Sequence, residues 1–175
     1  MQLKTLATNL IKFNCIAKLL AVGIAVSIGV PALAEVSQTT VKPFNPYYIQ
    51  GGTEDNNGTI LYICSTIVDG EYTPGKYYPP TQKCYVPWGG EEYAYEYAIF
   101  YTANSWTWVN FPGYILDNVR GGTEDNGANI LYFCRAIVDG EYTPGKYYPP
   151  NQTCYVSWGG EEYGFKSNFQ VLIAN

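Results

Sequence analysis

Residues 51–93 read GGTEDNNGTILYICSTIVDGEYTPGKYYPPTQKCYVPWGGEEY, and residues 121–163 read GGTEDNGANILYFCRAIVDGEYTPGKYYPPNQTCYVSWGGEEY. The two stretches align without a gap at an offset of 70, and 34 of their 43 positions are identical. Self-similarity of this kind indicates one supersecondary unit that is used twice. A binding site in one copy is therefore expected in the other, so we expect two sites per chain.

Each copy has the composition of short β-strands separated by turns. Residues 60–64 (ILYIC) are β-branched and aromatic, and the Asp-Gly pair at 69–70 is a favoured two-residue hairpin turn. We predict that the Pro-Gly pair at 74–75 forms a second turn and that the Pro-Pro pair at 79–80 ends strand pairing. Apolar runs at 97–101 and 169–173 predict a last strand in each copy.

No segment beyond residue 34 shows a sustained helical period, so the sequence predicts an all-β fold. We expect a compact antiparallel β-fold built from two tandem repeats of about 70 residues. The first repeat with its N-terminal lead spans 35–104 and the second spans 105–175, together forming one compact domain. Trp106, Trp108 and Phe111 in the segment between the repeated stretches predict a packed strand there.

Residues 1–34 have the pattern of a secretory signal peptide. Three lysines and no acidic residue precede an apolar run at 19–30, and Pro31-Ala32-Leu33-Ala34 offers small residues to a signal peptidase. The apolar run is shorter than the about 20 residues that cross a bilayer. We therefore expect cleavage near Ala34 and a secreted protein, extracellular or periplasmic.

Charge and composition exclude several classes of function. Beyond residue 34 the chain has seven basic and 15 acidic residues, a net charge of −8, which disfavours nucleic acid and anionic membranes as partners. The chain has no histidine, which excludes Ser-His-Asp and Cys-His catalysis and zinc sites that need imidazole. The acidic residues near Asn56 and Gly58 lack the spacing of an EF-hand loop, so we expect no metal and no other cofactor.

Four cysteines remain beyond the signal segment, and an even number in an exported protein indicates disulfides. They are Cys64, Cys84, Cys134 and Cys154. Each copy places two of them 20 residues apart in predicted strands, which favours Cys64–Cys84 and Cys134–Cys154. Pairing between the copies and a zinc site made of all four cysteines are the alternatives, although such a zinc site usually shows closer Cys-x-x-Cys spacing.

Each copy also groups polar and aromatic side chains near its predicted turns. In the first copy Glu54 and Asp55 follow a Gly-Gly pair, and Lys76 follows the Pro-Gly pair among tyrosines. A carboxylate accepts hydrogen bonds, an ammonium group donates three, and an aromatic face covers the C–H side of a sugar ring. The pattern indicates carbohydrate binding, with a surface salt bridge beside a turn as the simpler alternative.

The repeated unit resembles the DM-nine repeat family, whose repeat also forms the front module of natterin-type toxins. The resemblance is clearest in the second copy, in Gly121-Gly122, Tyr132, Cys134-Arg135-Ala136, Gly140, Pro144-Gly145-Lys146, Tyr155-Val156, Gly159-Gly160-Glu161 and Phe169-Gln170-Val171-Leu172. The first copy matches except that Ser65-Thr66 stands where the Arg-Ala pair is expected. The resemblance covers nearly all of the chain beyond the signal segment.

This resemblance implies a two-repeat β-fold, a non-catalytic mannose-binding lectin and the possibility of a homodimer. It also implies that an aspartate of the Gly-Gly segment and the lysine of Pro-Gly-Lys hold the sugar. The matching residues are Asp55 and Lys76 in the first copy and Asp125 and Lys146 in the second, with Glu54 and Glu124 as the neighbouring alternatives. Because Arg135 has no counterpart in the first copy, the two sites need not bind equally.

Two other functions compete with a lectin. A glycoside hydrolase needs two carboxylates about 5 Å or about 6.5–9.5 Å apart, and Glu91-Glu92 or Glu161-Glu162 with Asp55 are candidates. Adjacent residues on a strand point to opposite faces, and a solvated turn is the simpler interpretation of each Glu-Glu pair. Tyrosine-rich repeats are also compatible with adhesion or self-assembly. We expect a secreted lectin for a hexose on cell-surface glycans, mannose being the first candidate, whose binding is lost in a Lys76→Ala, Lys146→Ala variant with little change in melting temperature.

Overall fold

The structure is a computed structural model that describes residues 36–39, 45, 47–112 and 117–174, all within the unit Ala32–Asn175. These residues form fourteen β-strands and one 3-10 helix, η1 (Pro149–Asn151), and contain no α-helix. The predicted all-β fold is confirmed. The expected signal peptide and its cleavage near Ala34 lie outside the described residues. In the described part of the chain, no helix is long and apolar enough to cross a membrane.

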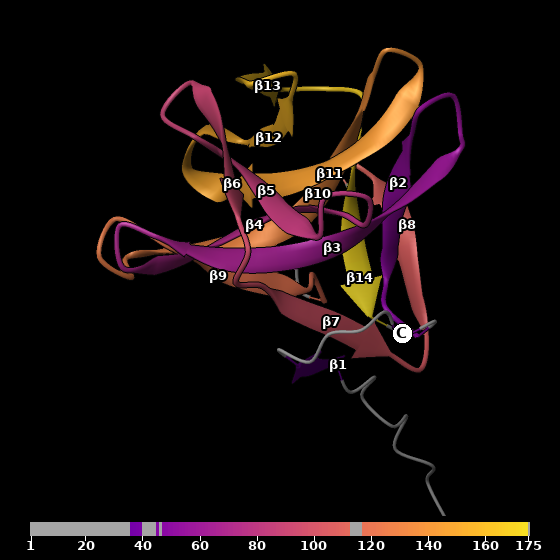
Figure 1. Ribbon diagram of the computed structural model, residues 1–175. Helices are drawn as coiled ribbons and strands as arrows, with labels where there is room; N and C mark the ends of the chain where they lie inside the picture. Colours follow the sequence, from indigo (N-terminus) through magenta and orange to yellow (C-terminus); the bar gives the residue numbers. More distant parts are fainter. Residues whose placement is uncertain (1–35, 40–44, 46, 113–116, 175) are drawn as a thin grey trace, which may run out of the picture. The chain divides into compact units, whose positions relative to one another are not determined.

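All the strands belong to one curled antiparallel sheet (Figure 1). The strands before residue 105 are β1 (Val36–Thr39), β2 (Gln50–Glu54), β3 (Thr59–Val68), β4 (Glu71–Tyr78), β5 (Lys83–Trp88), β6 (Glu91–Tyr95) and β7 (Ile99–Ala103). Those after it are β8 (Trp106–Asn110), β9 (Arg120–Glu124), β10 (Asn129–Val138), β11 (Glu141–Tyr148), β12 (Thr153–Trp158), β13 (Glu161–Phe165) and β14 (Phe169–Ala174). The strand predicted around Trp106 and Trp108 is β8.

The strand order is the same when it is followed from either end. The order is β1-β7-β3-β4-β5-β6-β13-β12-β11-β10-β14-β8, with β2 paired to β3 and β9 paired to β10 beside this path. The two halves meet where β6 pairs with β13 through Glu91 and Glu161. Equivalent strands therefore occupy equivalent places in the strand order on either side of this contact, so each half presents the same elements to the other.

The turns were predicted only in part. Asp69 and Gly70 have φ of 50° and 86° and join Val68 to Glu71, so the Asp-Gly pair makes the predicted two-residue hairpin. The turn predicted at 74–75 is wrong, because these residues lie inside β4. Instead of forming a turn, Pro74 and Gly75 pack closely against Gly121 and Tyr85. A Cβ on Gly75 would lie 2.1 Å from the Tyr85 carbonyl oxygen, and a Cβ on Gly121 would lie 2.5 Å from the Pro74 ring.

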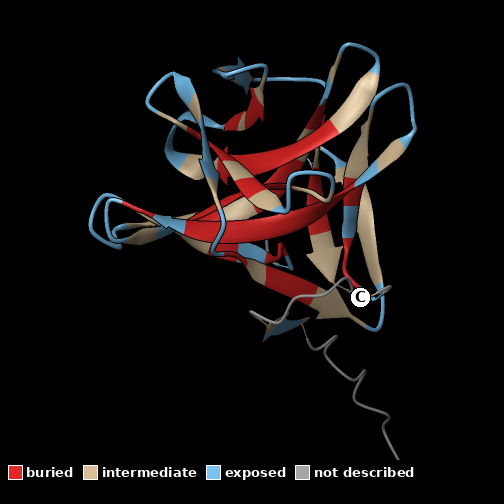
Figure 2. Cartoon of the chain, in the orientation of Figure 1, coloured by how far each residue is buried: buried red, intermediate tan, exposed pale blue. Residues whose placement is uncertain are grey.

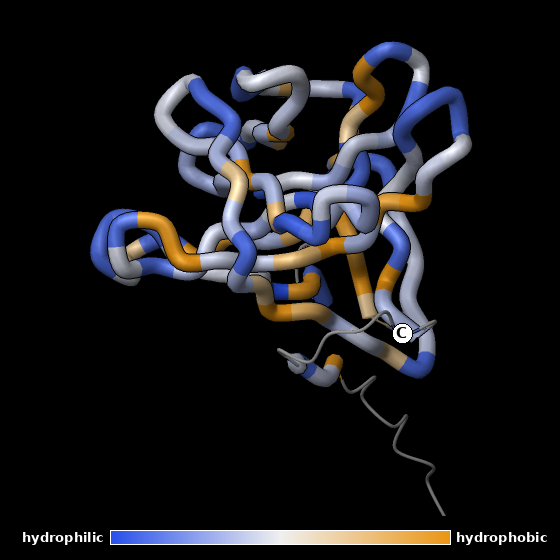
Figure 3. The backbone as a smooth tube through the Cα atoms, viewed as in Figure 1, coloured by the Kyte–Doolittle hydropathy of each residue, from blue (hydrophilic) through white to orange (hydrophobic). Residues whose placement is uncertain are grey.

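The core has one cluster in each half and a third that both halves share. Burial runs along the middle of β3 and β11, whereas the hairpin tips are exposed and hydrophilic (Figures 2 and 3). The shared cluster consists of Ile49, Ile63, Tyr101, Val119, Phe133 and Leu172. It joins the two halves as one hydrophobic unit, because side chains from both halves contribute to it.

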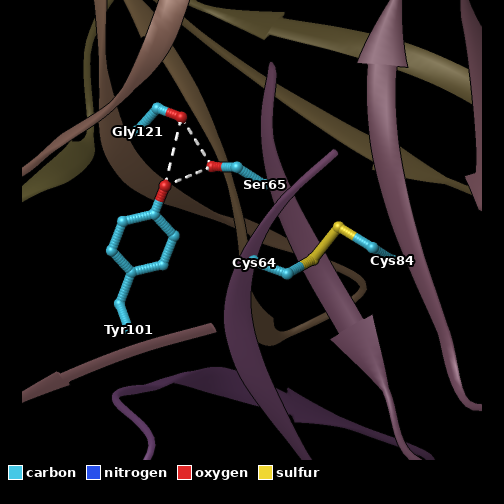
Figure 4. The surroundings of a disulfide bond; sticks show 5 residues. All are labelled: Cys64, Ser65, Cys84, Tyr101 and Gly121. Carbon is cyan, nitrogen blue, oxygen red and sulfur yellow. Dashed lines mark hydrogen bonds between the residues drawn. A yellow bond between two sulfur atoms is a disulfide. The ribbon is translucent and has the colours of Figure 1, made fainter. Parts of the chain in front are cut away.

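Both disulfides form within a copy, as favoured by the cysteine spacing. Cys64–Cys84 joins β3 to β5, and Cys134–Cys154 joins β10 to β12, in each case across the strand that lies between them. Figure 4 shows the first of these bonds beside Ser65 and Tyr101. Pairing between the copies and the four-cysteine zinc site are thereby excluded.

Candidate functional site

The two lysines of the Pro-Gly-Lys segments are buried, each between two carboxylates. Lys76 on β4 is 3% exposed, and its Nζ lies 3.5 Å from Glu54 Oε2 and 3.4 Å from Glu92 Oε1. Lys146 on β11 is equally buried, and its Nζ lies 3.3 Å from Glu124 and 3.8 Å from Glu162. A buried ammonium group requires such partners, because desolvation is not otherwise offset.

Each ammonium group is also covered by an indole ring from the other half of the chain. The Nζ of Lys76 lies 4.7 Å from the ring centre of Trp158, and the Nζ of Lys146 lies 4.4 Å from that of Trp88. Tyr85 is also close to Lys76, at 5.8 Å. The electron-rich faces favour the cation. Each lysine site is therefore assembled from both copies and is not contained in one.

A hollow of about 210 Å³ opens onto the Lys76 site. It is lined by Glu54, Lys76, Tyr78, Tyr85, Glu92 and Gly159. Within the described part of the chain, Glu54 Oε2 and Glu92 Oε1 are buried and have no hydrogen-bond partner, although both face the ammonium group at ion-pair distance. Burial raises the pKa of Glu54, and the nearby Lys76 opposes this shift. We call this hollow the Lys76 hollow.

The Gly-Gly turns of the two halves hold the second carboxylate of each site. Oε2 of Glu92 accepts a hydrogen bond from the Gly160 N–H at 2.9 Å, and Oε2 of Glu162 accepts one from the Gly90 N–H at 2.8 Å. The backbone N–H groups of the same two glutamates donate to the Gly160 and Gly90 carbonyls. Glu92 is thus an ordered strand residue facing Lys76, and not part of the solvated turn expected for Glu91-Glu92.

The predicted aspartates lie next to the lysine sites but do not contact the lysines. Asp55 is exposed, and its Oδ2 accepts hydrogen bonds from the Tyr78 hydroxyl at 2.8 Å and from Thr59 at 2.9 Å. These hydrogen bonds lower the pKa of Asp55, the one from Tyr78 contributing most. The structure therefore brings Glu54, not Asp55, together with Lys76, while Asp55 reaches the hollow through Tyr78.

The second copy repeats this arrangement. Asp125 accepts hydrogen bonds from the Tyr148 hydroxyl at 2.7 Å and from the Asn129 amide at 2.6 Å. The hydrogen bond to Asp125 is the main reason that the pKa of Tyr148 rises to about 12. Glu124, its neighbour in sequence, is the residue that contacts Lys146.

Four further residues of these sites were not predicted from the sequence: Glu92, Glu162, Trp88 and Trp158. All four lie within two residues of a Gly-Gly pair that both copies contain, which was the available signal. What the sequence does not show is that β6 and β13 pair across the two halves. That contact brings each Trp-Gly-Gly segment to the lysine of the other copy.

Comparisons with known proteins agree with the repeat and the fold. None of the curated proteins matches the chain. The crystal structure of the nematode sperm cell motility protein MFP2B is similar, with a TM-score of 0.60 and 18% sequence identity, over 82% of this chain and 47% of that chain. The chain thus spans about half the length of this structural relative, and the likeness shows the fold alone. The sequence profile of the DM9 repeat matches residues 54–165, and the chain belongs to the DM9 repeat family.

Proposed function

We propose that the chain is a secreted, non-catalytic lectin that binds a hexose at each of its two lysine sites. The observation that carries this proposal is the buried Lys76 ammonium group between two carboxylates at an open hollow. Glu54 and Glu92 offer acceptors to sugar hydroxyls, and Lys76 offers donors. The rings of Tyr78 and Tyr85 line the same hollow and are suited to the C–H face of a sugar.

The DM9 repeat and the two disulfides support the finer parts of this proposal. The family resemblance makes mannose on cell-surface glycans the first candidate and favours binding over catalysis. Disulfides are typical of proteins in oxidising compartments outside the cytosol. Two shallow sites per chain, doubled if the protein dimerises, would raise the avidity for a glycan surface far above the affinity of one site.

The experiment is an NMR titration of the protein, expressed for export, with mannose and a panel of other monosaccharides. Saturable shifts at the amides around Lys76 and Lys146 are expected with one class of hexose. A folded sample that shows no shift with any sugar would contradict the proposal, and self-association measured by sedimentation would then favour the adhesive function. New product signals with a disaccharide would instead indicate a hydrolase.

The best variants leave the buried ion pairs intact. Lys76→Ala would leave the buried Oε2 of Glu54 and Oε1 of Glu92 without a cation, so we now expect it to lower the melting temperature, unlike the expectation from sequence. Trp158→Leu removes only the ring above Lys76 and should weaken that site about tenfold while the Lys146 site still binds. Trp88→Leu is its matched control and should give the reverse pattern, because the indoles are exchanged between the copies.

A further inference from the structure

The two copies differ where Arg135 in the second copy corresponds to Ser65 in the first, and a hollow lies near this position in the first copy. In the second copy the guanidinium group of Arg135 lies 4.7 Å from the ring centre of Trp108 and 4.1 Å from that of Tyr142. It donates hydrogen bonds to the Gly51 carbonyl at 3.2 Å and to the side chain of Gln170 at 2.8 Å. Arg135 and Trp108 together fill the space over this glycine.

In the first copy, smaller side chains stand at the positions equivalent to Arg135 and Trp108. Strand register makes Ser65 equivalent to Arg135 and Ile99 equivalent to Gln170, because each faces the other on neighbouring strands. Gln38 is equivalent to Trp108, since it pairs with Tyr101 as Trp108 pairs with Leu172. A hollow of about 210 Å³ lies here, lined by Gln38, Tyr72, Ile99, Tyr101, Arg120, Gly121, Gly122 and Thr123. We call it the β1–β9 hollow.

Two polar side chains in or beside the β1–β9 hollow, Arg120 and Asn118, have no hydrogen-bond partner among the described residues. Arg120 is exposed, and its guanidinium group makes no hydrogen bond or ion pair with any described residue. Together with Gln38 it also lines an adjoining hollow of about 370 Å³. Asn118 in that second hollow is 8% exposed, and neither atom of its side-chain amide has a hydrogen-bond partner within the described residues. A buried amide without a hydrogen-bond partner is uncommon, so Asn118 indicates that a group outside the described residues provides its hydrogen bonds.

We propose that the β1–β9 hollow binds a sugar that carries a carboxylate, of the uronic acid class. Arg120 pairs with the carboxylate, because a guanidinium fork matches its two oxygens. Tyr72, which is 39% exposed, offers an aromatic ring to the sugar, while Gln38 and Asn118 take hydroxyl groups. This third site is separate from the two lysine sites and does not depend on their function.

Within the β1–β9 hollow, the charge of Arg120 favours an anionic ligand over a cationic one. Arg120 would repel a cation in the hollow. The Gly121 carbonyl, which corresponds to the acceptor that Arg135 uses, already accepts hydrogen bonds from Ser65 Oγ at 2.6 Å and from the Tyr101 hydroxyl at 3.3 Å (Figure 4). In the β1–β9 hollow itself a ligand therefore finds the Arg120 cation and the Gln38 amide, whereas the carboxylate of Asp117 lines the adjoining hollow beside Asn118.

The test is an NMR titration with glucuronate, with glucose and acetate as the comparison ligands. Saturable shifts at the amides of Gln38, Arg120 and Thr123 are expected with glucuronate only. Arg120→Gln should weaken binding about tenfold or more, because the ion pair is lost. Glutamine is the residue that the first copy has at the equivalent position, Gln50. Lys166→Gln removes one exposed positive charge elsewhere and should leave binding unchanged.

A second variant fills the hollow in the way the second copy does. Ser65→Arg with Gln38→Trp should abolish glucuronate binding but leave shifts with neutral hexoses at the lysine sites. If this variant does not fold, the Arg120→Gln result decides. Equal shifts with acetate or glucose, unchanged affinity in Arg120→Gln, or glucuronate shifts confined to the lysine sites would each overturn the proposal. Loss of neutral-hexose binding alone would contradict the lectin proposal and not this one.

Discussion

Each copy of the repeat donates hydrogen bonds to a backbone carbonyl of the other copy, and the two equivalent carbonyls receive them from different kinds of donor. In the first copy Ser65 and Tyr101, both neutral and buried, donate to the Gly121 carbonyl. In the second copy the charged Arg135 donates to the Gly51 carbonyl and is flanked by Trp108 and Tyr142. In both copies this carbonyl has a side-chain donor, but the size and charge of the donor side chain differ.

The lysine sites show the opposite behaviour, because both copies build them from the same residue types. Each needs a cation, two carboxylates, an indole ring and a Gly-Gly turn, and these parts come from both halves of the chain. Changing one part leaves a buried charge without its partner. A carbonyl that needs one donor tolerates exchange of the donor residue, whereas a buried cation with several partners does not tolerate exchange of its partners.

The largest expected effect tests the part of the structure that the two copies share most closely. Replacing Cys64 and Cys84 with alanine opens a loop of about 20 residues and should cost about 3 kcal/mol of unfolding free energy in the chain-entropy model. Replacing Cys134 and Cys154 should cost the same, because the separation is 20 residues in both copies. Denaturant unfolding measures both variants. A difference of more than about 1 kcal/mol between them would show that the copies are not energetically equivalent.

The second prediction concerns the side chain that only one copy has. Arg135→Ala removes two hydrogen bonds and two cation–π contacts from a half-buried position and leaves the Gly51 carbonyl without its donor. We expect a loss of about 2–3 kcal/mol in unfolding free energy. Burial lowers the pKa of Arg135 to about 10, so the side chain is charged at neutral pH. The loss of unfolding free energy should therefore be measurable at neutral pH. A loss below about 0.5 kcal/mol would mean that water replaces these contacts at no cost.

The fold was predictable from sequence where the information is local. Alternation of strand-forming residues, the Asp-Gly hairpin at 69–70 and the cysteine spacing within each copy all act over fewer than about 25 residues. The Pro-Gly pair at 74–75 was not predictable, because its role is contact with Gly121 and Tyr85. Turn statistics describe a free segment, and here packing against distant residues decides the conformation.

The candidate site was predictable only for the residues that one copy supplies. Lys76 and Glu54 lie on neighbouring parts of one copy and were identified, although Asp55 was preferred as the acid. Trp158 and the ordering of Glu92 by Gly160 depend on pairing between β6 and β13. An internal repeat shows that a unit recurs, but it does not show how two units face each other.

The third prediction compares the neutral donor with the charged one. Ser65→Ala removes the hydrogen bond that Ser65 Oγ donates to the Gly121 carbonyl and the one that it accepts from the Tyr101 hydroxyl at 2.9 Å. It leaves that hydroxyl 3.3 Å from the carbonyl as the remaining donor. The expected loss is about 1 kcal/mol, smaller than for Arg135→Ala, because the carbonyl is not left without a partner. Thermal unfolding of both variants under one condition gives the ranking. If Ser65→Ala costs more than Arg135→Ala, the shared donor arrangement in the first copy is the stronger one.

The smallest expected effect lies at the exposed aspartates. Hydrogen bonds lower the pKa of Asp55 and of Asp125, so each contributes stability above the unfolded-state pKa of about 3.9. That contribution is lost as the pH falls through the lower folded-state pKa. Tyr78→Phe and Tyr148→Phe remove the main cause of each shift, so a small decrease in melting temperature at pH 6 should vanish near pH 2.

The two tyrosine variants also compare the copies at their most exposed point. Thr59 remains as a donor to Asp55 in one variant, and the amide of Asn129 remains as a donor to Asp125 in the other. The Asn129 hydrogen bond is the shorter, at 2.6 Å against 2.9 Å, so Tyr148→Phe should change the pH dependence less than Tyr78→Phe. NMR titration of the two carboxyl groups measures this directly. A larger upward pKa shift for Asp125 than for Asp55 would mean that the tyrosine, and not the Thr59–Asn129 difference between the copies, controls each carboxylate.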